Sequence, residues 1–195
     1  MKTYLFLHPE QVTSQQLELE MLPQLPAWRR EQALKFRHLI GQVLCAEAYL
    51  LLKEGLRKDF GIADEVSFDY LEHGKPVLKE YPNIHFNLSH CLKGVLCVID
   101  EQGPVGCDIE SIERTVNEPL LQRCCNEEEI RQIRTVPDPD AEFMKIWTVK
   151  EAVLKYTGQG LIQDLPSLLS PEMIASIQLQ TCEKDGVVFT TCRAR

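Results

Sequence analysis

The chain has 195 residues, 44% of them hydrophobic and 26% charged, which fits one ordinary globular core or two small lobes that share a core. The net charge of −8 argues against a general nucleic-acid binder, so a phosphate-bearing partner would have to meet a local basic patch. No stretch approaches the roughly 18 to 20 apolar residues of a membrane span, and the N-terminal apolar run is too short for a signal peptide. The eight cysteines lack C-x-x-C spacing and are interpreted as buried free thiols of a reducing cytoplasm.

The first half of the chain alternates between helical and extended patterns. We predict a strand at residues 3–8 and a helix at 13–22. From Pro26 a helical pattern runs to Leu56 in two pieces, the first of them basic. The remaining elements are predicted to be extended segments around a His-Gly-Lys-Pro turn, a strand within 83–90, a short turn near Lys93 and Gly94, and a strand at 94–100.

The turn at 101–104 is the best candidate boundary between two halves of the chain. After it we predict a strand at 105–110, a helix that starts at the N-cap Asn126, and a helix at 142–156 that Gly158 closes. The C-terminal segment is predicted to be a hairpin that turns at Lys184-Asp185-Gly186. This order of elements predicts an α+β fold of mostly antiparallel strands with helices packed against them.

The strand "VGCDIE" divides its side chains between two faces. Val105, Cys107 and Ile109 form an apolar face, because successive side chains of a strand point to opposite sides. Asp108 and Glu110 share the other face, about 7 Å apart along the strand, beside a glycine that leaves room. Taken alone, two carboxylates on a strand are more often a solvent-facing edge than a site.

The helix "IWTVKEAVLK" places charges among apolar residues that point in nearly every direction, as in a helix buried on most sides. Glu151 and Lys155 lie one turn apart on one stripe, and Lys150 lies about 100° away from Glu151. A surface Glu151–Lys155 pair is the simpler alternative, but it fits poorly with the apolar flanks. Charges in a buried helix are costly unless they are paired or bound, so a functional site explains them better.

The three carboxylates Asp108, Glu110 and Glu151, without a Cys/His cluster, favour an oxygen-seeking cation, with Mg²⁺ the first choice and Mn²⁺ the second. Lysines nearby would neutralise substrate phosphates, which indicates phosphoryl or pyrophosphate chemistry. No P-loop or nucleophile elbow argues otherwise. An unrelated Mg²⁺-dependent phosphohydrolase is one alternative, and no further acidic motif supports it.

The pair "VGCDIE" and "WTVKEAVLK", preceded in order by "HGKP" and "FNLSH", resembles the signature of the Sfp-type 4′-phosphopantetheinyl transferases. Cys107 stands where that family usually has Ile or Val, on the face away from the carboxylates. The resemblance implies two similar lobes related by a pseudo-twofold axis, with the active site between them. We place the N-terminal lobe, with the nucleotide contacts, at 1–103 and the C-terminal lobe, with the metal and catalytic motifs, at 104–195.

The implied reaction moves the 4′-phosphopantetheine arm of coenzyme A to a serine of an apo acyl or peptidyl carrier protein and releases 3′,5′-ADP. Asp108, Glu110 and Glu151 would bind Mg²⁺, Glu151 would act as the base, and Lys155 would neutralise or protonate the leaving phosphate. The expected coenzyme A contacts are Lys75, Pro76, Ser89, His90, Lys150, Lys155, Arg30, Lys35 and Arg37.

Several of these assignments have plainer alternatives. His90 on its own would be a satisfied histidine at a strand end, and the basic residues of 28–38 could be a solvated helix face. A non-catalytic coenzyme A- or carrier-binding protein of the same fold is the main alternative, although such a binder would not need Glu151. A self-contained site between two lobes predicts a monomer. The cysteines predict a cytoplasmic protein, and the charge and the lack of a long apolar stretch predict no binding to nucleic acid or membrane.

Overall fold

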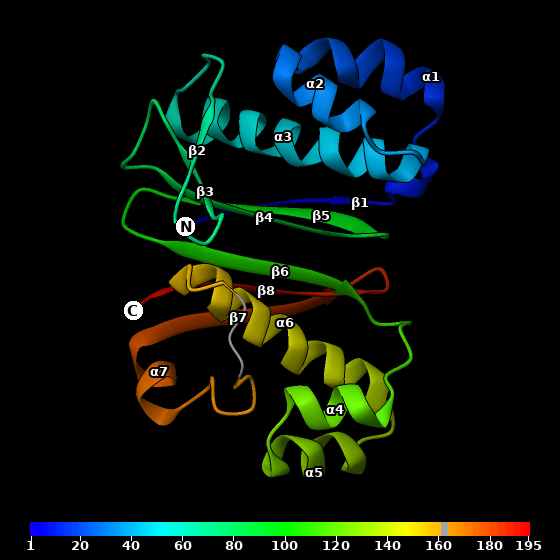
Figure 1. Cartoon of the computed structure of the whole chain (residues 1–195), viewed down its shortest axis with the longest axis vertical. Coiled ribbons are helices and arrows are strands. Elements are labelled where there is room, and N and C mark those ends of the chain that lie inside the picture. The colour runs from blue at the N-terminus through cyan, green and yellow to red at the C-terminus, as the bar shows by residue number, and fades with distance from the viewer. Residues whose placement is uncertain (161–163) are drawn as a thin grey trace.

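The computed structural model describes residues 1–160 and 164–195. Two three-stranded antiparallel sheets pack face to face, and helices cover the outer face of each (Figure 1). The expected α+β class with antiparallel strands is therefore confirmed. None of the helices in the described part of the chain is long and apolar enough to span a membrane.

The first sheet has the strand order β1-β5-β4, with both neighbouring pairs antiparallel. Its strands are β1 (Lys2–Leu7), β4 (His85–Cys91) and β5 (Gly94–Asp100). Helix α3 (Leu39–Phe60) lies on the outer face of this sheet, and α2 (Ala27–Leu34) covers α3. The helical pattern after Pro26 thus forms in two pieces, as predicted, and the segment before it forms α1 (Ser14–Gln16) and two short irregular helices, Leu17–Met21 and Leu22–Gln24.

A small hairpin made of β2 (Phe68–Tyr70) and β3 (Pro76–Leu78) carries the His-Gly-Lys-Pro turn. Gly74 has a φ of +81°, a left-handed conformation that glycine adopts without a steric penalty. The turn therefore forms at the predicted place.

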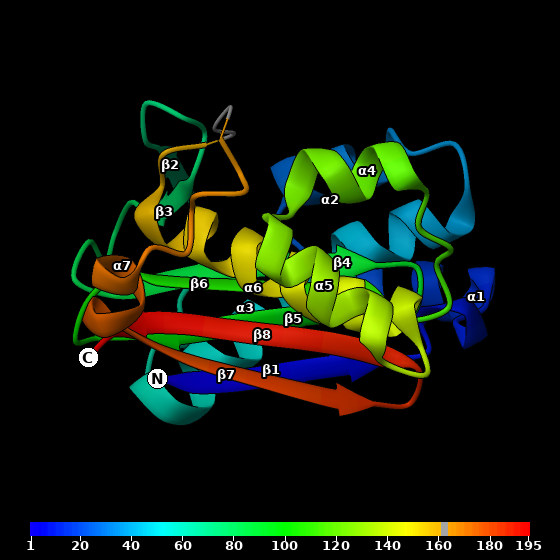
Figure 2. The same ribbon diagram turned by 90° about the horizontal axis from the view of Figure 1, so that it is seen from below.

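The second sheet has the strand order β6-β8-β7 and carries α6 (Pro139–Thr157) on its outer face (Figure 2). Its strands are β6 (Val105–Ser111), β7 (Ile177–Lys184) and β8 (Val187–Ala194). The β7–β8 hairpin turns at Asp185 and Gly186, which both have positive φ. In each half a strand is followed by helices and then by a hairpin whose second strand pairs with the first strand.

The helices between β6 and β7 are α4 (Glu118–Cys124), α5 (Glu127–Thr135), α6 (Pro139–Thr157) and α7 (Pro171–Ser176). The capping box of Asn126 and Glu129 is confirmed. Helix α6 begins at Pro139, three residues before the predicted start, because Asp138 caps it by accepting from the amide of Ala141. Helices α4 and α7 were not predicted, although an N-cap residue and a proline in the first turn mark each start.

Strand β6 separates its two faces as its sequence predicts. Val105, Cys107 and Ile109 are buried between the two sheets, in contact with residues of β5 and β8. The opposite face meets α6, and Gly106 lies at the closest approach. A Cβ atom there would overlap the carbonyl oxygen of Ala152 and the amide nitrogen of Tyr156, so glycine is what lets the helix lie against the strand.

Lys150 is a buried anchor of the second half. Its ammonium group, 1% exposed, donates to the carbonyl oxygens of Cys124 (2.8 Å) and Leu165 (3.0 Å) and to Glu129 Oε2 (2.7 Å). All three N–H groups of Lys150 have acceptors inside the protein, so in this structure none is free for the expected contact with coenzyme A. The side chain holds α4, α5 and the segment after α6 together.

Lys150→Met should destabilise the fold by about 3 kcal/mol or more, because it leaves the Glu129 carboxylate, only 13% exposed, without its cation and two carbonyl oxygens without their donor. Lys145→Met on the same helix is the control, since Lys145 is 38% exposed and its loss should change stability by less than about 1 kcal/mol. Urea unfolding of the two variants measures the difference. Equal, small losses would show that Lys150 is not an anchor.

Candidate active site

Asp108 and Lys155 form an ion pair where the two halves of the chain meet. Asp108 Oδ1, on β6, accepts from Lys155 Nζ, on α6, at 2.6 Å and from Ser89 Oγ, on β4, at 2.7 Å. The Lys155 ammonium also donates to Ser89 Oγ at 2.9 Å. The expected coenzyme A contact of Ser89 is replaced by these bonds, because its buried hydroxyl is already engaged with Asp108 and Lys155.

The ion pair keeps Lys155 charged. Burial is the largest single influence and would lower the pKa of Lys155. The charge of Asp108, the neighbouring Cys107, the hydrogen bond to Asp108 and the charge of Glu151 together outweigh it and raise that pKa above its ordinary value. An ammonium group in this state can neutralise a negative charge that develops nearby. It is a poor proton donor, because a raised pKa makes the proton harder to release.

Glu110 and Glu151 lie close enough to Asp108 for its negative charge to change their pKa values. Burial, and next the negative charge of Asp108, raise the pKa of both carboxyl groups. Lys155 acts against this shift at both, and Arg114 Nη1 lies 3.9 Å from Glu110 Oε1. The three carboxylates that the sequence singled out are thus neighbours.

The donor set fits a hard divalent cation. Asp108 Oδ2 is buried, and no hydrogen-bond donor of the described residues reaches it, so this carboxylate oxygen has no partner of its own. Carboxylate oxygens are what Mg²⁺ and Mn²⁺ prefer. Within residues 1–160 and 164–195, however, no three acidic, histidine or cysteine side chains are already arranged around a common metal position.

A cavity of about 290 Å³ lies beside the ion pair, with walls from both halves of the chain. Glu151 and Lys155 from α6 form one wall, and the His-Gly-Lys-Pro turn, which includes Pro76, forms another. The other lining residues are Asn87, Leu88, Leu154, Gly158 and Gly160. Pro76 therefore lies where a substrate bound next to Glu151 would touch it.

Lys75 lines the same cavity, but its ammonium group points into the protein. Its Nζ donates to the carbonyl oxygens of Val105 (2.9 Å), Lys155 (2.5 Å) and Tyr156 (3.2 Å). Cations favour the carbonyl end of a helix, so Lys75 ties the turn to the C-terminal end of α6. The Lys75 ammonium, an expected coenzyme A contact, is in this structure engaged with backbone carbonyls, and burial lowers the pKa of this side chain.

His90 is exposed and faces a second hollow, of about 610 Å³, which Glu110 and Arg114 also line. Desolvation, and next the positive charges of Lys155 and Arg29, lower the pKa of His90. Lys155 and Arg29 therefore lie close enough to His90 to affect it, while Glu110 and Glu113 also line this hollow. The sequence did not single out Arg29, which lies at the basic start of α2 and donates to the carbonyl oxygen of Cys45 at 3.1 and 2.8 Å.

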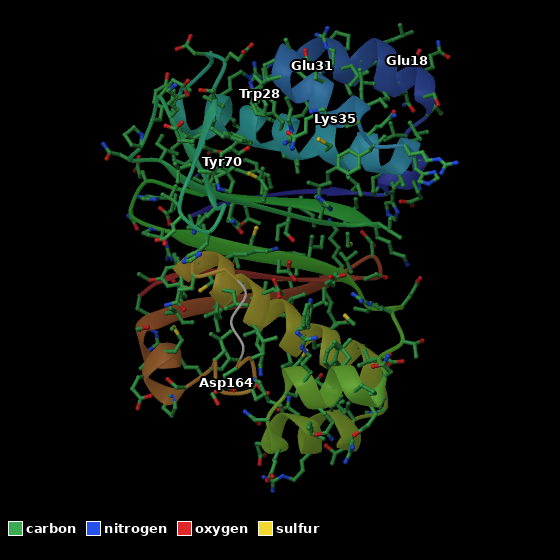
Figure 3. The ribbon with its side chains drawn as sticks, in the orientation of Figure 1. Glu18, Trp28, Glu31, Lys35, Tyr70 and Asp164 are labelled. Carbon is green, nitrogen blue, oxygen red and sulfur yellow. The ribbon has the colours of Figure 1, made fainter. Side chains whose placement is uncertain are left out.

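The basic segment is only partly available to a ligand. Arg30 donates to the carbonyl oxygens of Leu22 (3.0 Å) and Leu25 (3.3 Å), so its expected nucleotide contact is replaced by bonds that fix the preceding loop. Lys35 and Arg37 are exposed just after α2, and neither lines the cavity beside Glu151. Figure 3 shows Lys35 in the helical layer of the first half. Their role stays a prediction.

Asn87 is a site residue that the sequence did not reveal. Its buried Oδ1 accepts from the amide of Cys107 at 2.9 Å and so joins β4 to β6, two strands that belong to different sheets. The alternation in "FNLSH" puts Asn87 and Ser89 on one face of β4, which was the available signal. Both polar side chains are used to hold the halves together at the site.

Comparison with known proteins identifies the family of this chain. The 4′-phosphopantetheinyl transferase superfamily matches residues 104–187. The transferase psf-1 of Bacillus pumilus is 30% identical over 168 residues, which cover 83% of this chain and 71% of that protein. A 4′-phosphopantetheinyl transferase of Bacillus subtilis is 28% identical, and the match covers 77% of this chain and 67% of that protein. The transferase Sfp of Bacillus subtilis strain 168 is 27% identical, and the match covers 71% of this chain and 62% of that protein.

The family match spans the second half, which carries both carboxylate motifs, and the similarity to psf-1 extends over most of both chains. The family that the motifs predicted is confirmed on this evidence. The chain belongs to the 4′-phosphopantetheinyl transferase family.

Proposed function

We propose that this enzyme transfers the 4′-phosphopantetheine arm of coenzyme A to a serine of an apo acyl or peptidyl carrier protein and releases 3′,5′-ADP. One observation carries the proposal: Glu151 and Lys155 line a cavity between the two halves of the chain, directly beside the buried Asp108. A pyrophosphate in that cavity would lie next to a carboxylate base and a charged ammonium group.

Residues 1–103 and 104–195 are proposed to be two lobes related by a pseudo-twofold axis, with the active site between them. The repeated order of strand, helices and hairpin supports this division, as does the turn at 101–104 between β5 and β6. The first lobe supplies the His-Gly-Lys-Pro turn and the β4 side chains, and the second supplies the carboxylates and α6.

Asp108, Glu110 and Glu151 would hold the metal ion, Mg²⁺ by preference and Mn²⁺ as the second choice. The buried Asp108 Oδ2, which has no hydrogen-bond partner among the described residues, supports this ligand set. The raised pKa values of both glutamates, caused by burial and next by the charge of Asp108, support it as well. When bound, the ion gathers charge on the pyrophosphate and aligns it for attack.

Glu151 takes the proton of the carrier serine, directly or through a water molecule, as its hydroxyl attacks the β-phosphate. Its raised pKa makes it a stronger base than an ordinary glutamate. Lys155 neutralises the leaving phosphate of 3′,5′-ADP, and its raised pKa favours this electrostatic role over proton donation.

The coenzyme A contacts are proposed to come from Pro76, His90, Lys155, Lys35 and Arg37. Pro76 and Lys155 line the cavity, while His90 and the neighbouring Arg29 form the basic region outside it. The backbone of the His-Gly-Lys-Pro turn would cradle the adenine, with Lys75 fixing the turn instead of binding phosphate.

The partners are proposed to be an apo carrier protein and coenzyme A, and the enzyme to act as a monomer in the cytoplasm. All eight cysteines are free, as a reducing compartment requires. The charge of −8 gives no support to nucleic-acid binding.

Intact-mass analysis of an apo acyl carrier protein, incubated with the enzyme, coenzyme A and Mg²⁺, tests the proposal. We expect a mass gain of one phosphopantetheine arm, and no gain when EDTA replaces Mg²⁺. Binding of coenzyme A without any transfer would instead support the alternative, a binding protein of the same fold.

Glu151→Gln should keep the fold but lower turnover by about 10²-fold or more, because it removes both the base and a metal ligand. It should also raise the Mg²⁺ concentration needed for half-maximal rate. Glu142→Gln, on the same helix and outside the cavity, is the control and should leave both quantities unchanged. Near-normal turnover of Glu151→Gln would contradict the assigned role.

A further inference from the structure

A chain of threonine hydroxyls joins α6 to β8 beside the ion pair. Thr148 Oγ1, on α6, lies 3.0 Å from Thr190 Oγ1, on β8, and Thr190 Oγ1 lies 2.9 Å from Thr181 Oγ1, on β7. Thr148 Oγ1 also donates to the carbonyl oxygen of Lys145 at 3.0 Å. Thr148 and Thr190 are both fully buried, at 0% exposure.

These contacts allow one consistent direction of hydrogen bonding. Each hydroxyl has a single hydrogen, and that of Thr148 is used on the carbonyl oxygen of Lys145. Thr190 must then donate to Thr148, and Thr181 must donate to Thr190. Valine has almost the shape of threonine, but it can take neither role at position 190.

The hydroxyl chain lies next to the residues of the proposed reaction. Thr190 is the cross-strand partner of Asp108, and directly opposite residues of antiparallel strands have side chains on the same face. Thr148 precedes Glu151 by one turn and Lys155 by two turns on α6. The Thr148–Thr190 bond therefore fixes α6 at one end of the site, and the close approach at Gly106 fixes it at the other.

We propose that Thr190, acting through Thr148, is a positioning residue that sets α6 so that Glu151 and Lys155 face Asp108, an inference that rests on the proposed transferase function. The contact at Gly106 limits how near the helix can come, but van der Waals contact alone lets a helix slide or rotate. The directional hydrogen bond removes that freedom. Small misplacements of reacting groups have large effects on rate, so this bond should matter for turnover.

The chain offers two matched controls. Thr191 is the next residue on β8, on the opposite face and 3% exposed, and no described residue bonds to its Oγ1. Thr181 donates to the same Thr190 hydroxyl from β7, and among the described residues its own hydroxyl makes no hydrogen bond to α6. Valine at 191 therefore tests the loss of a buried hydroxyl on this strand, and valine at 181 tests the loss of a hydrogen bond to Thr190.

The experiment measures kcat, the KM for coenzyme A, and amide hydrogen exchange along α6 for five variants: Thr190→Val, Thr190→Ser, Thr148→Val, Thr191→Val and Thr181→Val. We expect Thr190→Val to lower kcat about tenfold with the KM changed less than about twofold, and to speed exchange in α6. Thr190→Ser should restore wild-type values. Thr148→Val removes the same hydrogen bond from the helix side, so it should reproduce the loss of kcat. It replaces Thr190→Val in the test if Thr190→Val does not fold.

Thr191→Val and Thr181→Val should keep kcat within about twofold of the wild type. If Thr190→Val and Thr148→Val behave like these two controls, or if Thr190→Ser is as impaired as Thr190→Val, the positioning role is overturned. A wild-type enzyme that transfers nothing to the carrier would instead overturn the proposed function, and this inference with it.

Discussion

Asp108 and Lys155 form an ion pair at a position where water cannot fully solvate either charge. The Asp108 side chain is 6% exposed and that of Lys155 is 29% exposed, so removing either partner leaves the other poorly solvated. The pair links β6 to α6, and Ser89 extends it to β4 in the other sheet. Gly106, Lys75 and Asn87 each keep one of these elements close to another. The proposed active site is the region that these contacts hold together.

The two lysines of α6 show how different two charges on one helix can be. Lys150 satisfies two carbonyl groups and a carboxylate inside the protein, whereas Lys155 borders the cavity beside Glu151. Helix geometry separates the two side chains by about 140°, which is enough to send one into the core and the other to the cavity. The residues between them, Glu151 to Leu154, include the proposed base and much of the apolar packing.

Most of the fold could be predicted from the sequence, because its local signals agree with one another. The alternation in β6, the capping box at Asn126 and the Asp185-Gly186 turn each depend on residues close in the chain, and each formed where predicted. The grouping of Asp108, Glu110 and Glu151 was also predictable, since strand and helix periodicity assign each carboxylate to a face. The short helices α4 and α7 were missed, although their N-caps are visible in the sequence.

The individual roles of the basic residues could not be predicted, because they depend on acceptors far away in the chain. Lys75 bonds to carbonyl groups 30, 80 and 81 residues away, and Lys150 bonds to Glu129 and to carbonyl groups on two different segments. The motif resemblance predicted that both lysines contact coenzyme A. In the structure both donate to backbone carbonyl oxygens, and Lys150 donates to Glu129 as well. Thr190 and Asn87 were missed for the same reason, since hydrogen bonds between elements leave no periodic pattern.

A double-mutant cycle on Asp108 and Lys155 tests the central claim most directly. The free energy of unfolding is measured in EDTA for Asp108→Asn, Lys155→Met and the double variant, with the exposed pair Lys145 and Glu183 as the control cycle. We predict a coupling energy of about 2 kcal/mol or more for Asp108 and Lys155, and less than about 1 kcal/mol for the control pair. Additive effects at Asp108 and Lys155 would show that the site is not organised around this ion pair.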